Sequence, residues 1–440
     1  MATASGLEES VRSRVEFPPG PLVVALSGGA DSAVLAWAAV GSADEVRAVF
    51  VDHGLAASAR LHQAAEDIAG RLGISLDVAE APVAADTPSF EDAARTVRYQ
   101  ALLAAAETDE TILTGHTADD QVETVLGNFL RGAGSGGLSG IPTRRGRLVR
   151  PLLAVTREES RQLATSLGLP FYDDPDNQSS DVRRNRLRSR LIPQLEAEYN
   201  PQLKTALLKT AALLAADDAA LEERAAAVPI IDDGEVVMVA APLLGVMHQA
   251  VATRVVRRAI RRVRGPHAGT ADEVAAVLDV ATGSRAAAEL AGRVRVEREG
   301  PMLVLGSHAA DCASPQSTSI PATVQFDRWR LSLEVKGDAP PSIGGRAFVL
   351  DADRIAAPLV IRTGVAGERL DIGEGSKRVG DALAEAGIPA RLRPRWPVVE
   401  SGGRIALIPG VRAAAWAWRG AATTRYLVAR IDDTATGEVN

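Results

Sequence analysis

Two short segments of this sequence combine the residue types that nucleotide chemistry needs. The first, Ser27 to Ser32, reads Ser-Gly-Gly-Ala-Asp-Ser and follows the apolar run Leu22 to Leu26. Its glycines let the backbone curl around an anion, and the N–H groups at the start of a following helix can bind phosphate. A carboxylate beside phosphate is repulsive unless it helps to hold Mg²⁺ or caps the helix, so Asp31 has one of these two roles. The segment lacks the Gly-Lys-Ser/Thr of a Walker loop and the GxGxxG of a dinucleotide fingerprint.

The second segment, Gly115 to Thr124, reads Gly-His-Thr-Ala-Asp-Asp-Gln-Val-Glu-Thr and follows the apolar run Thr111 to Thr114. Asp120 and Glu123 are three residues apart, so a helix that begins near Asp119 places both carboxylates on one face. Such a pair can recruit a cation and accept protons. The simpler alternative is that these acids stabilise the first helical turn. For His116 two roles remain open. It could contact phosphate or adenosine, or it could have a structural role.

The first third of the chain alternates apolar runs with helical patterns. It predicts strands at 22–26, 46–51, 74–79 and 111–114, and helices near 32–40, 58–72, 89–107 and 119–130. This alternation is typical of an α/β fold with a doubly wound parallel sheet, in which ligands bind at the carboxyl ends of the strands. Both polar segments follow predicted strands, so we expect them to meet at that edge.

Further along, the glycine-rich connection 131–146 is expected to be irregular, and a helix is expected at 156–167. Beyond it the pattern becomes mostly α-helical, with a hairpin around 232–234, one long basic helix over 243–264, and a helix that Thr270 and Glu273 begin with a capping box and Gly283 ends. Short alternating runs at 331–335, 348–350, 359–362 and 404–408 predict a small β-rich C-terminal domain. The predicted domains are 1–200, 201–306 and 321–440, with a linker at 307–320.

Composition limits the classes of function. The 440 residues include one cysteine, Cys312, which excludes an internal disulfide and a cysteine-based zinc site. No apolar run is long enough for a membrane span, and the N-terminus lacks the apolar core of a signal peptide, so we expect a cytoplasmic protein. The net charge is −7, yet two arginine-rich runs without acids, 183–190 and 254–264, could bind a polyanion or form solvated helix faces.

The segment Ser27 to Ser32 resembles the pyrophosphate-binding loop of the N-type ATP pyrophosphatases, which have an adenine nucleotide alpha hydrolase-like PP-loop domain. These enzymes cleave ATP between its α and β phosphates to adenylate a substrate. Val51-Asp52-His53-Gly54 is similar to their adenosine-side segment. The resemblance implies ATP and Mg²⁺ as cofactors, with Mg²⁺ near Asp31, and these ATP-binding residues: Ser27, Gly28, Gly29, Ala30, Asp31, Ser32, Asp52 and His53.

Several further segments, in this order, resemble the bacterial tRNA(Ile)-lysidine synthetases. They are the second polar segment, the glycine-rich stretch from Arg131, Arg150-Pro151-Leu152-Leu153, Asp173-Asp174-Pro175-Asp176-Asn177 and Arg184-Asn185-Arg186-Leu187-Arg188. The helix with Arg95 and Arg98, and C-terminal pieces at Arg362, Gly367-Glu368-Arg369 and Gly410-Val411-Arg412, also resemble that family. The sequence departs from the family pattern at Asp176 and at Phe171-Tyr172, which affects only the role of that loop.

The resemblance implies a ligase that attaches free L-lysine to C2 of the wobble cytidine in a CAU-anticodon tRNA(Ile), through an adenylated cytidine. The implied catalytic residues are Asp31, His116, Asp120 and Glu123. The implied tRNA or substrate contacts are Arg95, Arg98, Arg131, Arg184, Asn185, Arg188, Arg257, Arg258 and Arg261. We expect no zinc, no redox cofactor and no membrane partner, and the sequence leaves the oligomeric state open, with a homodimer as one option.

Three other functions are weighed against this one. A tRNA thiolase of the same superfamily generally needs thiols, and Cys312 is the only one. A synthetase of the NAD or GMP type uses the same loop but gives no reason for the arginine runs. A non-catalytic tRNA-binding relic would have no reason to keep both polar segments intact.

Overall fold

The computed structural model describes residues 4–54, 58–83, 90–173, 183–266, 268–306, 313–338, 340 and 347–434. The contacts group the chain into two compact units, Met1–Ala220 and Leu221–Asn440. Within the described ranges, no helix is both long and apolar enough to cross a membrane.

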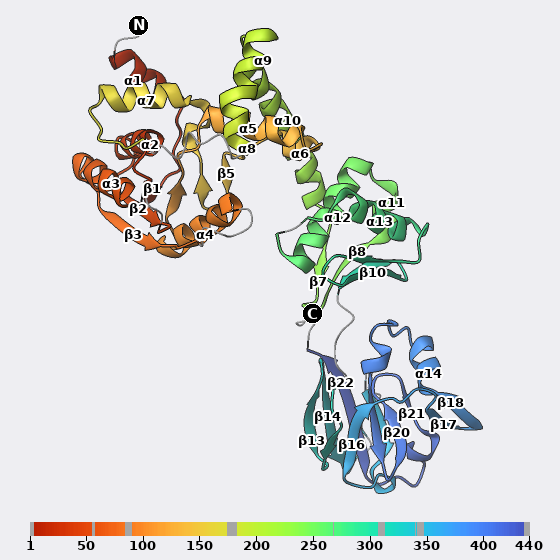
Figure 1. Ribbon diagram of the computed structural model, residues 1–440. Helices are drawn as coiled ribbons and strands as arrows, with labels where there is room; N and C mark the ends of the chain where they lie inside the picture. Colours follow the sequence, from red (N-terminus) through yellow and green to blue (C-terminus); the bar gives the residue numbers. More distant parts are fainter. Residues whose placement is uncertain are drawn as a thin grey trace. The chain divides into compact units, whose positions relative to one another are not determined.

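The first unit is built on one twisted sheet with the strand order β3-β2-β1-β4-β6-β5 (Figure 1). Every neighbouring pair is parallel except β5 with β6 at the edge. The strands are β1 (Leu22–Ala25), β2 (Val46–Asp52), β3 (Leu76–Glu80), β4 (Thr111–Leu113), β5 (Arg144–Arg145) and β6 (Leu148–Val149). The predicted doubly wound parallel sheet is confirmed.

Helices cover both faces of this sheet because successive strand residues point to opposite sides. Leu22 and Val24 enter a core with helices α1 (Ala4–Arg12), α2 (Ala30–Val40), α3 (Ser58–Leu72) and α7 (Arg157–Ser166). Val23 enters a separate core with Leu102 of α4 (Phe90–Ala105). Helix α5 (Ala118–Phe129) follows β4. These elements match the predicted ones to within a few residues.

The glycine-rich connection 131–146 is more ordered than expected, since it holds helix α6 (Ser135–Leu138) and strand β5. Gln121 of α5 fixes it, because its Oε1 accepts the Ile141 backbone N–H at 2.5 Å. The chain then passes through η1 (Pro151–Ala154) and α7. After the residues outside the described ranges come α8 (Arg183–Arg186), the π-helical turn η3 (Leu187–Leu191), α9 (Ile192–Glu198) and α10 (Leu203–Ala226).

The region 231–306 combines helices with an antiparallel sheet of order β7-β8-β11-β10-β9. Its strands are β7 (Ile231–Asp232), β8 (Val236–Ala240), β9 (Ala287–Leu290), β10 (Val294–Glu299) and β11 (Met302–Gly306). Its helices are α11 (Ala241–Val246), α12 (Gln249–Arg264) and α13 (Ala271–Thr282). The hairpin and the capping box of α13 are confirmed, with Gly283 in the left-handed conformation. The sheet beyond the hairpin was not predicted.

The single helix predicted over 243–264 is wrong, because the chain leaves the helical conformation at Met247 and His248. Met247 is extended (ψ 159°), and the His248 ring accepts the Ala250 N–H at 3.2 Å, so it caps the start of α12. An N-cap side chain that satisfies a free N–H competes with helix continuation.

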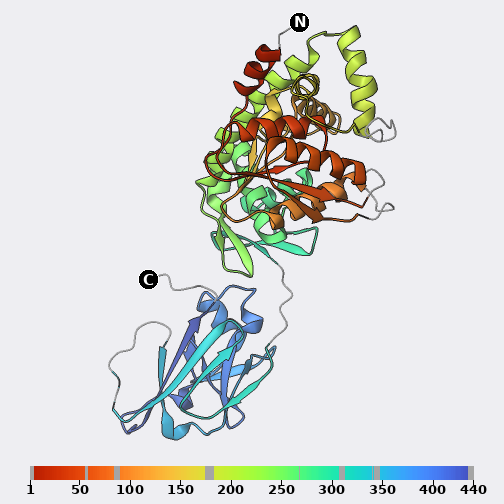
Figure 2. The ribbon, with the colours of Figure 1, turned by 90° about the vertical axis from the view of Figure 1, so that its left-hand side faces the viewer.

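The C-terminal region is β-rich, as predicted, and Figure 2 shows its strands in colours from teal to blue. One sheet has the order β12-β16-β19-β20-β21 and another β13-β14-β22-β15, with a small β17-β18 pair. Leu359 of the first sheet and Trp329 of the second share one core. Strand β12 lies within the predicted linker and pairs with β16, so that part of the linker is sheet, while residues 307–312 lie outside the described ranges.

The elements of this region are β12 (Gln316–Thr318), β13 (Ala322–Phe326), β14 (Trp329–Lys336), β15 (Ala347–Asp351), η4 (Ala352–Arg354), β16 (Leu359–Thr363), β17 (Arg369–Gly373), β18 (Gly375–Arg378), α14 (Val379–Glu385), η5 (Arg393–Arg395), β19 (Pro397–Ser401), β20 (Arg404–Ile408), β21 (Arg412–Ala413), η6 (Ala415–Ala417) and β22 (Tyr426–Asp433).

Candidate active site

The loop between β1 and α2 has a shape that only glycine permits at its second position. Gly28 has φ +81°, and a Cβ there would lie 2.3 Å from the carbonyl oxygen of Leu61 in α3. The Ser32 hydroxyl accepts a hydrogen bond from the Ser27 N–H (3.2 Å) and donates one to the Gly29 carbonyl (2.9 Å). The loop is therefore closed on itself by its own serines.

The start of α2 offers N–H groups to an anion. The first intrahelical hydrogen bond runs from Ala33 N–H to Gly29 O at 3.0 Å. The preceding N–H groups, of Ala30, Asp31 and Ser32, therefore have no acceptor within the helix. Gly29 is the N-cap and supplies no side chain, so Asp31 does not cap this helix. Unlike an ordinary capped terminus, this one is open to a phosphate group.

Asp31 is a half-buried carboxylate with one unused oxygen. Its Oδ1 is buried and has no hydrogen-bond partner among the described residues, and its Oδ2 lies 3.6 Å from Nε of Arg157. Burial raises the pKa of Asp31 to about 6, although Arg157 acts in the opposite direction. A buried carboxylate oxygen without a donor is suited to a cation.

The second polar segment lies against this loop. A Cβ on Gly115 would lie 3.3 Å from the backbone nitrogen of Ser32, so the two loops are in contact. At the start of α5, Asp120 Oδ2 accepts the backbone N–H of Thr117 at 2.7 Å and its hydroxyl at 2.9 Å. Asp120 therefore caps the helix with one oxygen and leaves the other for the site.

Arginines from three later elements, α7, α8 and η3, converge on the carboxylates of α5. Asp120 Oδ1 accepts Nη2 of Arg157 at 2.9 Å and Nη2 of Arg184 at 2.8 Å. Glu123, whose side chain is 2% exposed, accepts Nε of Arg184 and Nε of Arg188, both at 2.6 Å. Burial alone would raise the pKa of Asp120, but Arg157 and Arg184 hold it below its usual value. The predicted shared face of Asp120 and Glu123 is confirmed.

His116 lies beside this cluster with both ring nitrogens engaged. Its Nε2 is 3.3 Å from Nη1 of Arg95, and its Nδ1 is 3.0 Å from the Thr114 hydroxyl. Burial lowers the pKa of His116 to about 3. The ring is therefore neutral near pH 7 and is suited to a hydrogen bond rather than to donating a proton.

The adenosine-side segment follows β2, the neighbour of β1. His53 Nδ1 lies 2.9 Å from the Ala81 carbonyl, and its Nε2 accepts Nε of Arg98 at 3.4 Å. Asp52 accepts the Gly54 N–H at 2.8 Å, and this bond lowers the pKa of Asp52. His53 and Arg98, far apart in sequence, are thus in contact at the carboxyl end of the sheet.

The remaining predicted residues lie in different settings. Arg131 is exposed and donates to the Asn128 side chain. Asn185 is half-buried on α8, between Arg184 and Arg188 of the cluster. Asp173 forms an ion pair with Arg161, whereas Asp174 to Asn177 lie outside the described residues.

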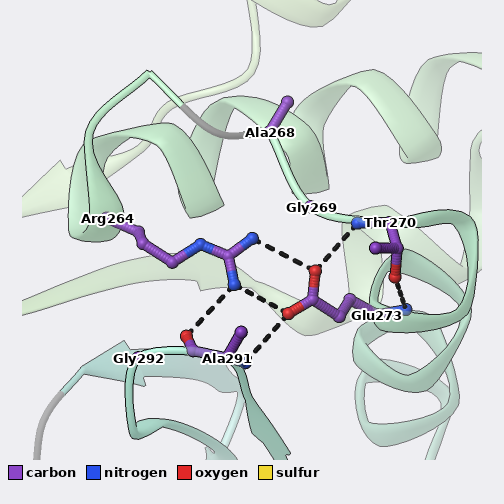
Figure 3. Close-up of a pocket in the computed structure, with 7 residues that line it drawn as sticks. All are labelled: Arg264, Ala268, Gly269, Thr270, Glu273, Ala291 and Gly292. Carbon is purple, nitrogen blue, oxygen red and sulfur yellow. Dashed lines mark hydrogen bonds and ion pairs between the residues drawn. The ribbon is translucent and has the colours of Figure 1, made fainter. Parts of the chain in front are cut away.

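The predicted tRNA contacts on α12 differ from one another. Arg257 donates to the Gly269 carbonyl at 2.9 Å, and Arg258 donates to the Ala225 carbonyl. Arg261 is exposed. At the end of the helix, Arg264 pairs with Glu273 at 2.7 Å and donates to Ala291 O (Figure 3). This helix therefore uses much of its positive charge within its own domain.

Sequence reasoning missed Arg157. It stands at the first position of α7, behind the N-cap Thr156, whose hydroxyl accepts the Glu159 N–H at 3.2 Å. In the sequence this is an ordinary capping box, and nothing in its spacing relates it to the acids of α5. Among the described residues, no group of histidine, cysteine, aspartate and glutamate could hold a metal ion by itself.

The parallel sheet, the glycine loop and the open helix start define a PP-loop nucleotide-binding enzyme. A family model described as "PP-loop domain" matches residues 5–195, and one described as "TilS substrate C-terminal domain" matches residues 359–427.

The chain is similar to a tRNA(Ile)-lysidine synthase of Symbiobacterium thermophilum, with 32% identity over 92% of each chain. It is 33% identical to the synthase of Thermus thermophilus over 90% of this chain and 69% of the relative. It is 43% identical to that of Salinispora arenicola over 50% of this chain and 71% of the relative. The chain belongs to the tRNA(Ile)-lysidine synthase family.

Proposed function

We propose that this chain attaches L-lysine to C2 of the wobble cytidine in CAU-anticodon tRNA(Ile) and releases AMP and pyrophosphate. The observation that carries the proposal is the contact between two loops: Gly115, ahead of the acids of α5, packs against Ser32 of the phosphate loop. An activating nucleotide and an amine could therefore meet at one place. The names of the relatives support the choice of tRNA and of lysine.

In the first step, the C2 oxygen of cytidine attacks the α-phosphorus of ATP, and pyrophosphate leaves. The open N–H groups of Ala30, Asp31 and Ser32 suit the departing phosphates. Mg²⁺ is commonly held by one or two carboxylates together with substrate phosphates, so the unpartnered Oδ1 of Asp31 fits this ion. When bound, Mg²⁺ neutralises phosphate charge.

In the second step, the ε-nitrogen of lysine attacks C2, and AMP leaves with the former C2 oxygen. The amine has an ordinary pKa of about 10.4, so it must first lose a proton. Asp120 and Glu123 are the carboxylates that we assign to the recruitment of the ammonium group and to the acceptance of that proton. His116, which is neutral, is assigned a hydrogen-bonding role rather than that of an acid.

The tRNA needs cationic and hydrogen-bonding contacts along its phosphates. We assign these to residues around the site and on α12: Arg95, Arg98, Arg131, Arg184, Asn185, Arg188, Arg257, Arg258 and Arg261. Arg261 is the best suited of the α12 set, because it is exposed. The target cytidine must also leave its stack before it can react.

The test is mass spectrometry of nucleosides from unmodified CAU-anticodon tRNA(Ile) after incubation with the protein, Mg-ATP and L-lysine. The expected product is a cytidine that has gained lysine less water, only in the complete mixture. If AMP and pyrophosphate form without the adduct, the nucleophile or the tRNA is wrong. If neither forms with folded protein, the non-catalytic alternative is favoured.

A further inference from the structure

The carboxylates of Asp120 and Glu123 are fully paired by the chain's own donors. Each carboxylate has about four acceptor sites. Asp120 accepts the Thr117 N–H and hydroxyl on Oδ2, and Arg157 and Arg184 on Oδ1. Glu123 accepts Arg157 (3.4 Å) and Arg188 (2.6 Å) on Oε1, and Arg184 (2.6 Å) and Arg188 (3.2 Å) on Oε2. An incoming ammonium group must therefore replace one of these donors.

When one donor leaves, another must keep the carboxylates aligned. Arg157 has the geometry for this role, because its guanidinium spans the three acids: Nη2 contacts Asp120 at 2.9 Å, Nη1 contacts Glu123 at 3.4 Å, and Nε lies 3.6 Å from Asp31. It thus joins the acid beside the phosphate loop to the two acids of α5.

The backbone of Arg157 is fixed from several directions. Its N–H donates to Asp119 Oδ2 at 2.8 Å. The preceding turn is tied to α5 by the Ala118 N–H, which donates to Val155 O at 2.9 Å. Glu159, in the same turn of α7, pairs at 2.6 Å with Arg14, two residues after the end of α1. Because this backbone is well anchored, the guanidinium loses little additional conformational entropy when it binds the acids.

We propose that Arg157 is a positioning residue that holds Asp31, Asp120 and Glu123 in register, so that the lysine amine is presented to the adenylated cytidine. It acts through these carboxylates and does not touch the substrate. The inference rests on the proposed lysine ligase function and deepens it. Arg184 and Arg188 remain the donors that we assign to exchange with the amine and to contact the RNA.

The test compares Arg157→Ala and Arg157→Lys with the control Arg161→Ala, which removes an exposed arginine one turn along α7 that pairs with Asp173. Lysine KM, tRNA KM and the ratio of lysine transferred to pyrophosphate released are measured with purified tRNA. For Arg157→Ala we expect lysine KM to rise about tenfold or more, as for the loss of charge-assisted hydrogen bonds. The tRNA KM should change by less than about twofold, and the transfer ratio should fall well below that of wild type.

Arg157→Lys keeps one charge but cannot span three carboxylates, so it should recover kcat more fully than lysine KM. It also serves as the decisive variant if Arg157→Ala does not fold, as judged by thermal melting. A wild-type lysine KM and transfer ratio in a folded Arg157→Lys or Arg157→Ala protein would overturn the proposal. Failure of the wild-type protein to form the lysine adduct would instead overturn the proposed function.

Discussion

The guanidinium of Arg95 determines where His116 carries its proton, because Arg95 Nη1 lies 3.3 Å from His116 Nε2. Arginine can only donate, so Nε2 must accept and Nδ1 must hold the hydrogen. Nδ1 in turn faces the Thr114 hydroxyl at 3.0 Å. With its pKa lowered to about 3 by burial, His116 is a neutral ring of defined tautomer.

This state predicts how stability depends on pH. An unfolded histidine gains a proton near pH 6.5, whereas folded His116 does so near pH 3. Between these values the unfolded chain binds more protons, so the stabilisation is present above about pH 6.5 and decreases as the pH falls towards about 3. Glutamine cannot titrate. The melting temperature of His116→Gln should therefore fall less than that of wild type when the pH is lowered from about 7.5 to about 5.5.

Differential scanning calorimetry at the two pH values would measure this. His62→Gln is the control, since His62 is a partly exposed residue on α3 that pairs with Glu66. This variant controls for the replacement of a histidine elsewhere in the same unit. Equal losses in wild type and in His116→Gln would contradict a neutral, buried His116.

Asp31 and Asp120 should respond oppositely to neutral substitutions. Asp120 offsets the charge of Arg157 and Arg184 and caps α5, so Asp120→Ala should cost about 3 kcal/mol of stability, as for the loss of a partner from a buried ion pair. Asp31 has one oxygen without a donor among the described residues. Asp31→Asn should therefore leave the melting temperature equal or higher while pyrophosphate release is lost.

Chemical denaturation of both variants beside a pyrophosphate-release assay separates the two effects. Asp173→Asn, which affects an exposed ion pair with Arg161, serves as a control with near-normal stability. The expectation for Asp31 is wrong if Asp31→Asn unfolds at a clearly lower denaturant concentration than wild type.

Substitution by alanine should affect stability very differently at the two glycines of the phosphate loop. Gly28→Ala should cost more than about 2 kcal/mol, because the left-handed backbone disfavours a Cβ and that atom would meet Leu61 O at 2.3 Å. Gly29 has φ −89°, and a Cβ there would meet only the Ser27 hydroxyl oxygen, at 3.7 Å. Thermal melting should show a large loss for Gly28→Ala and a small one for Gly29→Ala. Similar losses would contradict the loop geometry.

The parts of this site that could be predicted from the sequence are those with local causes. The loop from Ser27 to Ser32 follows from an apolar strand that ends in two glycines, and the shared face of Asp120 and Glu123 follows from helix periodicity. Arg157 could not be predicted, because its relation to these acids arises only when the fold brings the start of α7 to the start of α5. The same holds for the contact between His53 and Arg98, which depends on the order of strands in the sheet.

The fold shows the same division between local and non-local causes. The alternation of strands and helices predicted the parallel sheet, since each element is set by its own hydrophobic pattern. The break between α11 and α12 depends on the His248 ring, which accepts a backbone N–H, and a histidine rarely signals a helix start. Strand β12 falls within the predicted linker because its pairing with β16 is made across a long stretch of sequence.

Glu273 predicts acid sensitivity in the second unit. The Arg264 guanidinium, with the N–H groups of Thr270 and Ala291, lowers the pKa of Glu273 to about 2 (Figure 3). The stabilisation is therefore present above the unfolded value of about 4.3 and is lost as the pH falls towards about 2. Glu273→Gln should lower the melting temperature at neutral pH and converge with wild type near pH 2. Asp272→Asn, at the neighbouring residue, is the control. The prediction would be contradicted if the difference in melting temperature between Glu273→Gln and wild type were as large near pH 2 as at neutral pH.

Two arginines of α12 are expected to have different roles, Arg258 in stability and Arg261 in tRNA binding. Arg258 donates to the Ala225 carbonyl, so Arg258→Ala should destabilise the fold by about 1.5 kcal/mol through the loss of a charged hydrogen bond. Arg261 is exposed, so Arg261→Ala should leave the melting temperature unchanged. If Arg261 contacts a tRNA phosphate, its removal should also reduce the slope of log affinity against log salt concentration by about 1.

Filter binding of tRNA(Ile) across a salt series, with thermal melting of each variant, measures both roles. Arg71→Ala is the matched control. Arg71 is an exposed arginine in the last turn of α3, whereas Leu61, which approaches the phosphate loop, lies in the first turn of that helix. Its affinity and salt slope should equal those of wild type. An Arg261→Ala protein with an unchanged salt slope would remove Arg261 from the tRNA contacts, and the α12 arginines would then act within their own domain alone.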